Sequence, residues 1–212
     1  MARGRLARAY LLLYNAAACA LWAAAAARLA TAPGGLGGAY AAAAPPIRAA
    51  QTLALAEIVH AAVGLGGGSP PLVAVQVLGR NLVLFGVLGA LPAVAATRVA
   101  GALLAVWTAV EVVRYPYYLG GLVGVVPGAL TWARYSAFLP LYPAGMAAEV
   151  GCYVAALPAI DAGGLYRVAL PNAANFAFDF GTFVRAALPL YLYFGPALYV
   201  HMLRQRRRKL AA

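Results

Sequence analysis

The chain has 212 residues, of which 65% are hydrophobic and only 10% are charged, and its formal net charge is +11. Soluble domains are about 45–50% apolar and about 25% charged, so this composition excludes an ordinary soluble protein. It predicts one all-α, polytopic membrane domain over residues 1–212. Cys19 and Cys152, each isolated in an apolar stretch, form neither a disulfide framework nor a zinc site.

Six apolar stretches are candidate membrane spans, which predicts a six-transmembrane-helix bundle. A polar, Gly- and Pro-containing loop is expected between the first span and about residue 48, and a short turn at 66–71. The region 159–182 is the most polar internal stretch. The predicted spans cover about 10–30, 51–66, 72–91, 98–119, 130–157 and 183–203, and a basic tail follows at 204–212.

The positive charge is gathered at the two ends of the chain, beside apolar spans. This position is typical of a topological signal, so we favour orientation over nucleic-acid binding. Six spans place both termini on one side, and the positive-inside rule makes that side cytoplasmic. The clustered basic residues are Arg3, Arg5, Arg8, Arg204, Arg206, Arg207, Arg208 and Lys209.

Two of the spans have alternative interpretations. The first resembles a signal peptide, but its roughly 20 apolar residues exceed the usual core of about 7–15, so we expect a retained helix. The fifth contains Pro140 and Pro143 and is either one bent helix or two shorter helices.

Three glutamates, Glu57, Glu111 and Glu149, lie inside or at the edge of apolar runs. An ionisable group at the centre of a membrane costs about 2.5–3.5 kcal/mol, so we expect at least one of them to be functional. Glu57 and His60 share a helix face. A di-metal centre needs the Glu-x-x-His motif twice, and with only two histidines the chain cannot assemble one, so a buried pair that joins helices is the favoured interpretation. Glu111 and Arg114 have the same spacing and predict an intramembrane ion pair.

Tyr142 and Glu149 combine a phenol and a carboxylate on one helix face. Seven residues rotate an α-helix by about 700°, which leaves the two side chains about 20° apart and about 10.5 Å apart along the axis. Pro143 and Gly145 lie between them, so a bend and a wet pocket are expected. A carboxylate that takes a proton and a phenol that donates a hydrogen bond suit proton chemistry.

The chain resembles the very-long-chain 3-hydroxyacyl-CoA dehydratases, also called tyrosine-phosphatase-like membrane proteins. The specific patterns are W-x-x-x-E-x-x-R-Y and R-Y…L-Y-P-x-G-x-x-x-E, and the string PNAANFAFDF at 171–180 is similar to the plant-type branch. The other matching strings are LYNAAACALW at 13–22, QTLALAEIVHAAVGL at 51–65, QVLGRNLVLFGVL at 76–88, WTAVEVVRYPYYL at 107–119, LTWARYSAFLPLYPAGMAAEV at 130–150 and HMLRQRRRK at 201–209.

The resemblance implies that Tyr142 and Glu149 are the catalytic pair. It implies water elimination from a long-chain 3-hydroxyacyl-CoA to give the trans-2-enoyl-CoA, which is the third step of fatty acid elongation, in the endoplasmic reticulum membrane. The implied partners are the condensing enzyme, the ketoacyl-CoA reductase and the enoyl-CoA reductase. Such an elimination needs no metal and no redox cofactor. The candidate substrate-binding residues are Arg80, Arg114, Arg134 and Tyr135.

Two departures from the family pattern bear on the substrate head group. Gly79 stands where the family usually has Ser, and Gly67-Gly68-Ser69-Pro70 replaces Val-Arg-Ser-Pro, so one basic residue is missing.

The sequence predicts no phosphatase activity. The residue six positions after Cys152 is Pro158, and a cysteine phosphatase needs an arginine there to hold phosphate. The alternatives to a dehydratase are a proton-coupled transporter and an inactive relative that scaffolds elongation enzymes.

Overall fold

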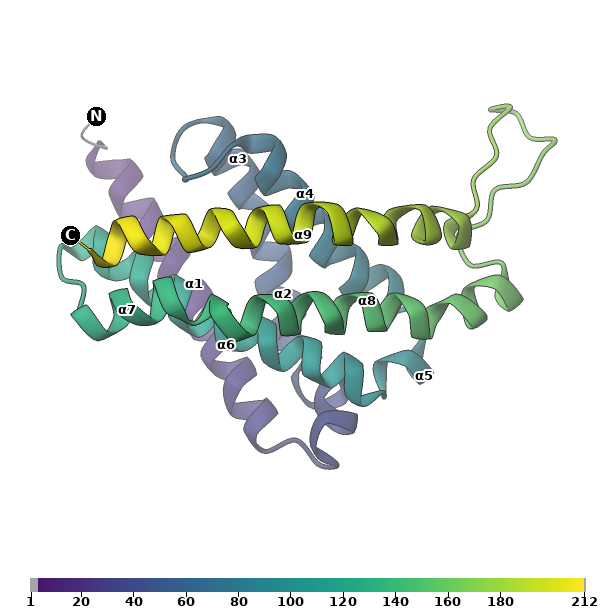
Figure 1. Cartoon of the computed structure of the whole chain (residues 1–212), viewed down its shortest axis with the longest axis horizontal. Helices are drawn as coiled ribbons and strands as arrows, with labels where there is room; N and C mark the ends of the chain where they lie inside the picture. The colour runs from purple at the N-terminus through teal and green to yellow at the C-terminus, as the bar shows by residue number, and fades with distance from the viewer. Residues whose placement is uncertain (1–3, 212) are drawn as a thin grey trace.

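The computed structural model describes residues 4–211, which form a bundle of helices (Figure 1). Within this part of the chain, the one β-type pairing is an isolated bridge between Val168 and Phe178. In chain order the elements are α1 (Arg5–Ala30), η1 (Gly35–Gly38), α2 (Ala39–Ala54), α3 (Ala56–Ala62), α4 (Pro70–Asn81), the π-helical segment η2 (Leu82–Leu88), α5 (Pro92–Ala95), α6 (Arg98–Val123), α7 (Gly128–Ser136), α8 (Phe138–Gly163) and α9 (Phe180–Leu210).

The core lies where α1, α2 and α6 pack together and where α8 packs against α6. Its small residues allow close helix contact in a bundle where packing replaces the hydrophobic drive of water. Trp22 of α1 and Leu103 and Leu104 of α6 are buried there. Helix α9 packs mainly against α7 and α8, so it forms one side of the bundle (Figure 1).

Five helical stretches are long and apolar enough to cross a membrane, so the chain is a multi-pass membrane protein. Large apolar side chains point outward on several of them, as expected for surfaces in contact with lipid. Leu192 and Tyr193 of α9 are 81% and 75% exposed. The five stretches are Arg5–Ala30, Pro70–Leu88, Arg98–Val123, Gly128–Gly163 and Phe180–Leu210.

The loop predicted up to about residue 48 is wrong, and so are the bounds of the second span. Helix α2 begins at Ala39 and includes Pro45 and Pro46, and after a break at Leu55 the chain continues as α3 to Ala62. The reason is packing: Ala39, Ala43, Ile47 and further residues at helical spacing are buried, so tertiary contacts outweigh the weak helix propensity of proline. A short connection is present as predicted, but it covers 63–69, because Pro70 and Pro71 already form the first turn of α4.

The third and fourth spans are confirmed with small shifts. The third is α4 continued by η2, which stops before Pro92, and the fourth is α6, which extends to Val123. Thr97 caps the start of α6 by accepting a hydrogen bond from the Ala100 backbone at 3.2 Å.

The fifth span consists of two successive helices, α7 and α8, separated at Ala137. Helix α8 runs through Pro143 and Pro158 to Gly163, six residues beyond the predicted end at 157. Prolines are tolerated inside membrane helices because neighbouring groups satisfy the freed backbone carbonyls.

The last span, α9, begins at Phe180 and continues through the basic tail to Leu210. Arginine and lysine are good helix formers and interact favourably with the C-terminal end of the helix dipole, so the tail remains helical. The start of α1 and the end of α9 lie at the same end of the molecule (Figure 1).

Candidate active site

Tyr142 and Glu149 both point from α8 towards α9, as their seven-residue spacing predicts. The Tyr142 hydroxyl donates to the backbone oxygen of Gly195 at 3.3 Å, and its ring stacks on Tyr199. The Glu149 carboxylate accepts a hydrogen bond from the Tyr191 hydroxyl at 2.7 Å. Both side chains are half-buried. The Tyr142 hydroxyl and the Glu149 carboxylate therefore lie along one strip of α8 that faces α9, which we call the Tyr142–Glu149 strip.

Gly195 allows α9 to approach α8 at this strip. A Cβ at this position would lie 2.2 Å from the terminal carbon of Met146, which is closer than atoms can pack. The end of the Met146 side chain therefore occupies the space beside Gly195, next to the carbonyl oxygen that accepts from Tyr142.

Two groups that act on Glu149 differ in how far the sequence identified them. Tyr191 gave no signal, because it is one of three tyrosines in an apolar span and no local spacing sets it apart from Tyr193 and Tyr199. Arg80 was identified, but as a substrate contact; its guanidinium on α4 pairs with Glu111 and also acts electrostatically on the Glu149 carboxylate. The site therefore combines residues of α4, α8 and α9.

The other two intramembrane glutamates belong to a buried ion network beside this site. The predicted ion pair between Glu111 and Arg114 is confirmed, with Nε 2.5 Å from Oε2. Glu111, which is 1% exposed, also pairs with Arg80. Arg114 reaches on to Glu57 at 2.9 Å, so two arginines and two glutamates join α3, α4 and α6.

Further groups complete this network. Tyr115 donates to Glu57 at 2.7 Å, and Arg80 lies over the ring of Trp107. The amide oxygen of Gln51, in the orientation that satisfies both groups, accepts from Arg80 at 2.8 and 3.0 Å. Buried charges are tolerated when they are paired and hydrogen-bonded, and these partners meet that requirement.

The predicted direct pairing of Glu57 with His60 is replaced by two separate contacts, because each side chain bonds its own tyrosine of α1. His60 Nε2 lies 2.7 Å from the Tyr10 hydroxyl, and Tyr14 donates to Glu57 at 3.3 Å. The two residues nevertheless join α3 to α1, which is the structural role expected for them. Within residues 4–211, no three His, Cys, Asp or Glu side chains gather as a potential metal site.

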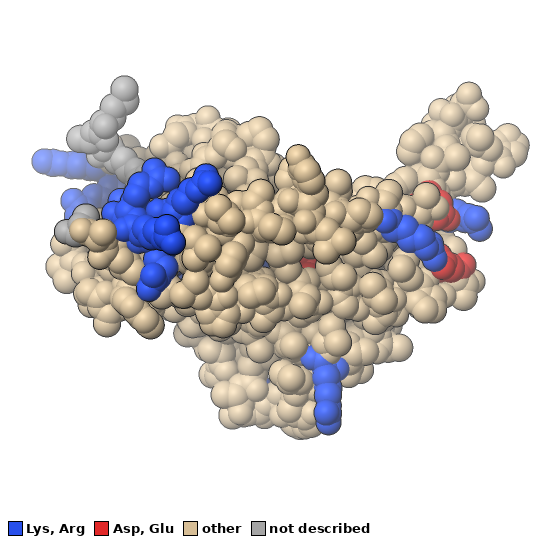
Figure 2. Space-filling view, viewed as in Figure 1, with Lys and Arg blue, Asp and Glu red and all other residues tan. Residues whose placement is uncertain are grey.

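Arg134 and Tyr135 lie on α7. The Arg134 and Arg114 guanidinium groups both lie over the Tyr118 ring, at 5.7 and 5.9 Å from its centroid. Arg134 donates to the Tyr118 hydroxyl at 3.3 Å, and the Tyr135 hydroxyl lies 3.3 Å from that of Tyr117. Here α7 meets the end of α9, where Arg206 donates to Ser136 at 3.1 Å. Lys and Arg gather at this end of the molecule, which we call the basic end (Figure 2).

Comparison with known proteins identifies the family. Residues 51–212 match the family model described as protein tyrosine phosphatase-like protein, PTPLA. The chain belongs to this family. Across 97% of its length it is 36% identical to the very-long-chain (3R)-3-hydroxyacyl-CoA dehydratase 2 of Homo sapiens, of which the alignment covers 82%.

A plant member of the family is also similar to the chain. The very-long-chain (3R)-3-hydroxyacyl-CoA dehydratase PASTICCINO 2A of Oryza sativa subsp. japonica is 34% identical over 81% of this chain and 78% of its own length. The very-long-chain (3R)-3-hydroxyacyl-CoA dehydratase of Gallus gallus is 41% identical over a shorter alignment, which covers 49% of this chain and 29% of that protein. No solved structure shows a significant likeness to the chain.

Proposed function

We propose that this protein removes water from very-long-chain 3-hydroxyacyl-CoA and releases the trans-2-enoyl-CoA, the third step of the fatty acid elongation cycle. The observation that carries the proposal is the face of α8 on which Tyr142 and Glu149, two helical turns apart, both point towards α9 in a chain of the dehydratase family. Proton transfer by positioned groups is the chemistry that such an elimination requires.

Glu149 acts as the general base in this proposal. Its carboxylate removes the proton from C2 of the acyl group. The hydrogen bond from Tyr191 keeps that carboxylate in its orientation. The charge that develops on the thioester oxygen needs a nearby hydrogen-bond donor or cation.

Tyr142 acts as the general acid. The C3–O bond breaks as the C2=C3 double bond forms, and the leaving hydroxide takes the phenol proton to become water. The proton gained by Glu149 then returns to the Tyr142 oxygen, so each turnover leaves both groups unchanged. Before substrate binds, Tyr142 bonds only weakly, at 3.3 Å, to the Gly195 carbonyl, which leaves its hydroxyl available.

The four arginine and tyrosine candidates divide into two groups. Arg134 and Tyr135 at the basic end are proposed to contact the anionic coenzyme A head, because phosphates bind arginine and phenol donors. Arg80 and Arg114 have carboxylate partners in Glu111 and Glu57, so we assign them to positioning the helices that form the site.

We further propose six membrane spans, with α2 and α3 together as the sixth. The two helices cover Ala39–Ala54 and Ala56–Ala62, which is long enough to cross despite the break at Leu55. The basic residues at both ends support cytoplasmic termini, and the family supports residence in the endoplasmic reticulum beside the other elongation enzymes.

The test is dehydration of a long-chain 3-hydroxyacyl-CoA by purified, detergent-solubilised protein. Wild-type protein is expected to form enoyl-CoA, while Glu149→Gln and Tyr142→Phe each lower kcat by about 10²–10⁴-fold. Tyr193→Phe, on an exposed tyrosine of α9, is the matched control and should retain full activity. Absence of product with folded wild-type protein would favour a scaffold, and equal product from all variants would exclude this catalytic pair.

A further inference from the structure

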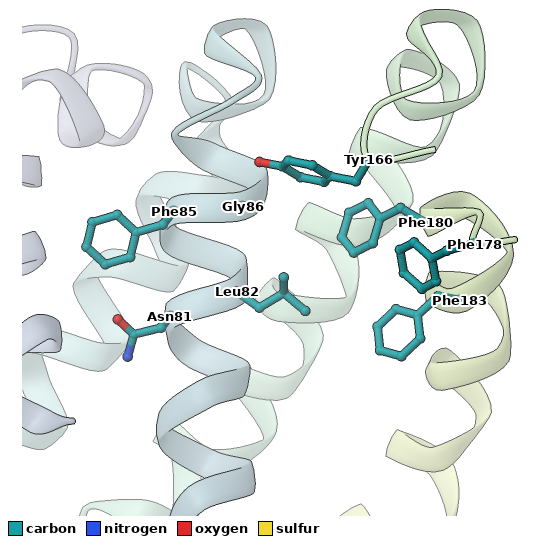
Figure 3. A pocket seen from close by; sticks show the side chains of 8 residues that line it. All are labelled: Asn81, Leu82, Phe85, Gly86, Tyr166, Phe178, Phe180 and Phe183. Carbon is teal, nitrogen blue, oxygen red and sulfur yellow. The ribbon is translucent and has the colours of Figure 1, made fainter. Parts of the chain in front are cut away.

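An aromatic cleft lies between the η2 segment and the beginning of α9, and we call it the distal cleft. It has a volume of about 560 Å³. Leu82 and Gly86 form one wall, and Tyr166, Phe178, Phe180 and Phe183 form the other (Figure 3). The lining is almost entirely apolar, so the cleft suits a hydrocarbon ligand.

The aromatic wall is held in place by the connection between α8 and α9. Val168 and Phe178 exchange two backbone hydrogen bonds, of 2.8 and 3.0 Å. The Arg167 guanidinium pairs with Asp179 at 3.4 Å. The side chain of Asn172 bonds the backbone of residues 169, 174 and 176 across the tip of this connection.

The aromatic rings of this wall also support one another. Tyr166 meets Phe180 edge to face at 5.4 Å between ring centroids, and Phe183 lies 6.0 Å from Phe178 and 6.1 Å from Phe180. A wall fixed at both its backbone and its rings presents a defined boundary to any chain that reaches it.

Each wall of the distal cleft belongs to a helical stretch that also carries a residue acting on Glu149. On one side, Gly86 follows Arg80 by six residues along α4 and η2, and Arg80 acts electrostatically on Glu149. On the other side, Phe183 precedes Tyr191 by eight residues, or about 12 Å, and Tyr191 bonds Glu149. The distal cleft is therefore separated from the reacting carbons by the length of an acyl segment.

The distal cleft and the basic end lie in opposite directions from Glu149. Helix α8 starts next to α7 at the basic end and finishes at Gly163, three residues before Tyr166. An amphiphile with an anionic head at the basic end and its reacting carbons at Glu149 would extend its apolar tail towards the distal cleft. The charges and the apolar lining are complementary to the two ends of such a molecule.

We propose that the distal cleft receives the far end of the substrate acyl chain, and that Gly86 and Phe183 set the chain length that fits. This inference rests on the proposed dehydratase activity. Gly86 leaves room for the chain: a Cβ there would lie 3.0 Å from Leu82 and 4.0 Å from Tyr166, so a larger side chain would extend into the cleft. Phe183 lines the cleft from α9.

The experiment measures kcat/KM for a series of 3-hydroxyacyl-CoA substrates of increasing chain length. Gly86→Leu fills the cleft and is expected to lower the ratio of long-chain to short-chain kcat/KM by about tenfold, the effect of excluding about two methylenes. Phe183→Ala opens the cleft and should shift the preferred length in the opposite direction, towards longer chains.

Two matched controls lie outside the cleft. Gly121→Leu adds the same side chain to α6, where a Cβ meets no atom within 4 Å, and Tyr193→Ala removes an exposed aromatic ring from α9. Both controls should keep the wild-type length profile.

Each failure has a distinct signature. A folded wild-type protein that is inactive at every length would overturn the proposed function itself. If the wild type is active and both cleft variants keep its length profile, only the proposed role of the distal cleft in chain-length selection is overturned. If Gly86→Leu is inactive at every length because it folds poorly, Phe183→Ala decides: a shift towards longer chains supports the proposal and an unchanged profile contradicts it.

Discussion

The hydroxyl of Tyr191 donates a 2.7 Å hydrogen bond to the Glu149 carboxylate, so α9 orients the group that α8 carries. Helix α9 packs mainly against α7 and α8, and this contact lies in the middle of its interface with α8. The position of the proposed base therefore depends on how α9 lies against the rest of the bundle.

Tyr191→Phe is expected to lower kcat by about tenfold to a hundredfold with little change in KM. A hydrogen bond to a charged group contributes about 1.5–3 kcal/mol, and its loss leaves the carboxylate less well oriented. Steady-state kinetics with a long-chain 3-hydroxyacyl-CoA would measure both constants. A change confined to KM would mean that Tyr191 contacts the substrate and does not position Glu149.

Glu111→Gln is expected to destabilise the fold by about 3–5 kcal/mol, because it leaves the charges of Arg80 and Arg114 without their shared carboxylate. Thermal unfolding in detergent would show this as a lower Tm. Asp161→Asn is the control: Asp161 also pairs with an arginine, Arg185 at 2.5 Å, but both are exposed, so Tm should change little. An equal decrease in Tm for the two variants would show that the burial of an ion pair does not determine its contribution to stability.

Asp179 predicts a pH dependence at the start of α9. Its carboxylate accepts a 2.7 Å hydrogen bond from the Thr182 backbone, which holds the pKa of Asp179 below its usual value, and Arg167 adds to the effect. Because the folded-state pKa is lowered, the cap stabilises the helix above the unfolded pKa of about 3.9 and is lost as pH falls through the folded value.

Amide hydrogen exchange at Thr182 would measure that loss. Protection, compared at each pH with the intrinsic exchange rate, should fall below about pH 4 in the wild type. Asp179→Asn is the matched variant, since asparagine also caps helices but does not titrate in this range. The same pH-dependent loss in both proteins would show that another group is responsible.

Arg134→Ala is expected to raise KM for the coenzyme A substrate several-fold while kcat stays near the wild-type value. The guanidinium lies at the basic end, away from the Tyr142–Glu149 strip, so it would contribute to binding and not to the chemical step. Arg28→Ala removes an exposed arginine that bonds the Ala42 carbonyl and should leave KM unchanged. Raised ionic strength should reproduce the Arg134 effect, because salt screens exposed charges.

Local patterns in the sequence were sufficient for part of the site. The i, i+3 spacing of Glu111 and Arg114 and the i, i+7 spacing of Tyr142 and Glu149 each specify a shared helix face, and the structure has both arrangements. The pairing of Glu57 with Arg114 and the contact of Glu149 with Tyr191 join residues 57 and 42 positions apart, and no local spacing encodes them.

The sequence by itself determined the membrane class, the all-helical architecture, the family and most of the spans, because apolar length and helical periodicity are local properties. It did not determine that residues 39–50 are helical, since the packing of Ala43 and Ile47 against other helices outweighs the two prolines. The tertiary structure alone decided which partner neutralises each buried charge and where the distal cleft lies. Both depend on the distances between helices that are far apart in the chain, and only the packed bundle fixes those distances.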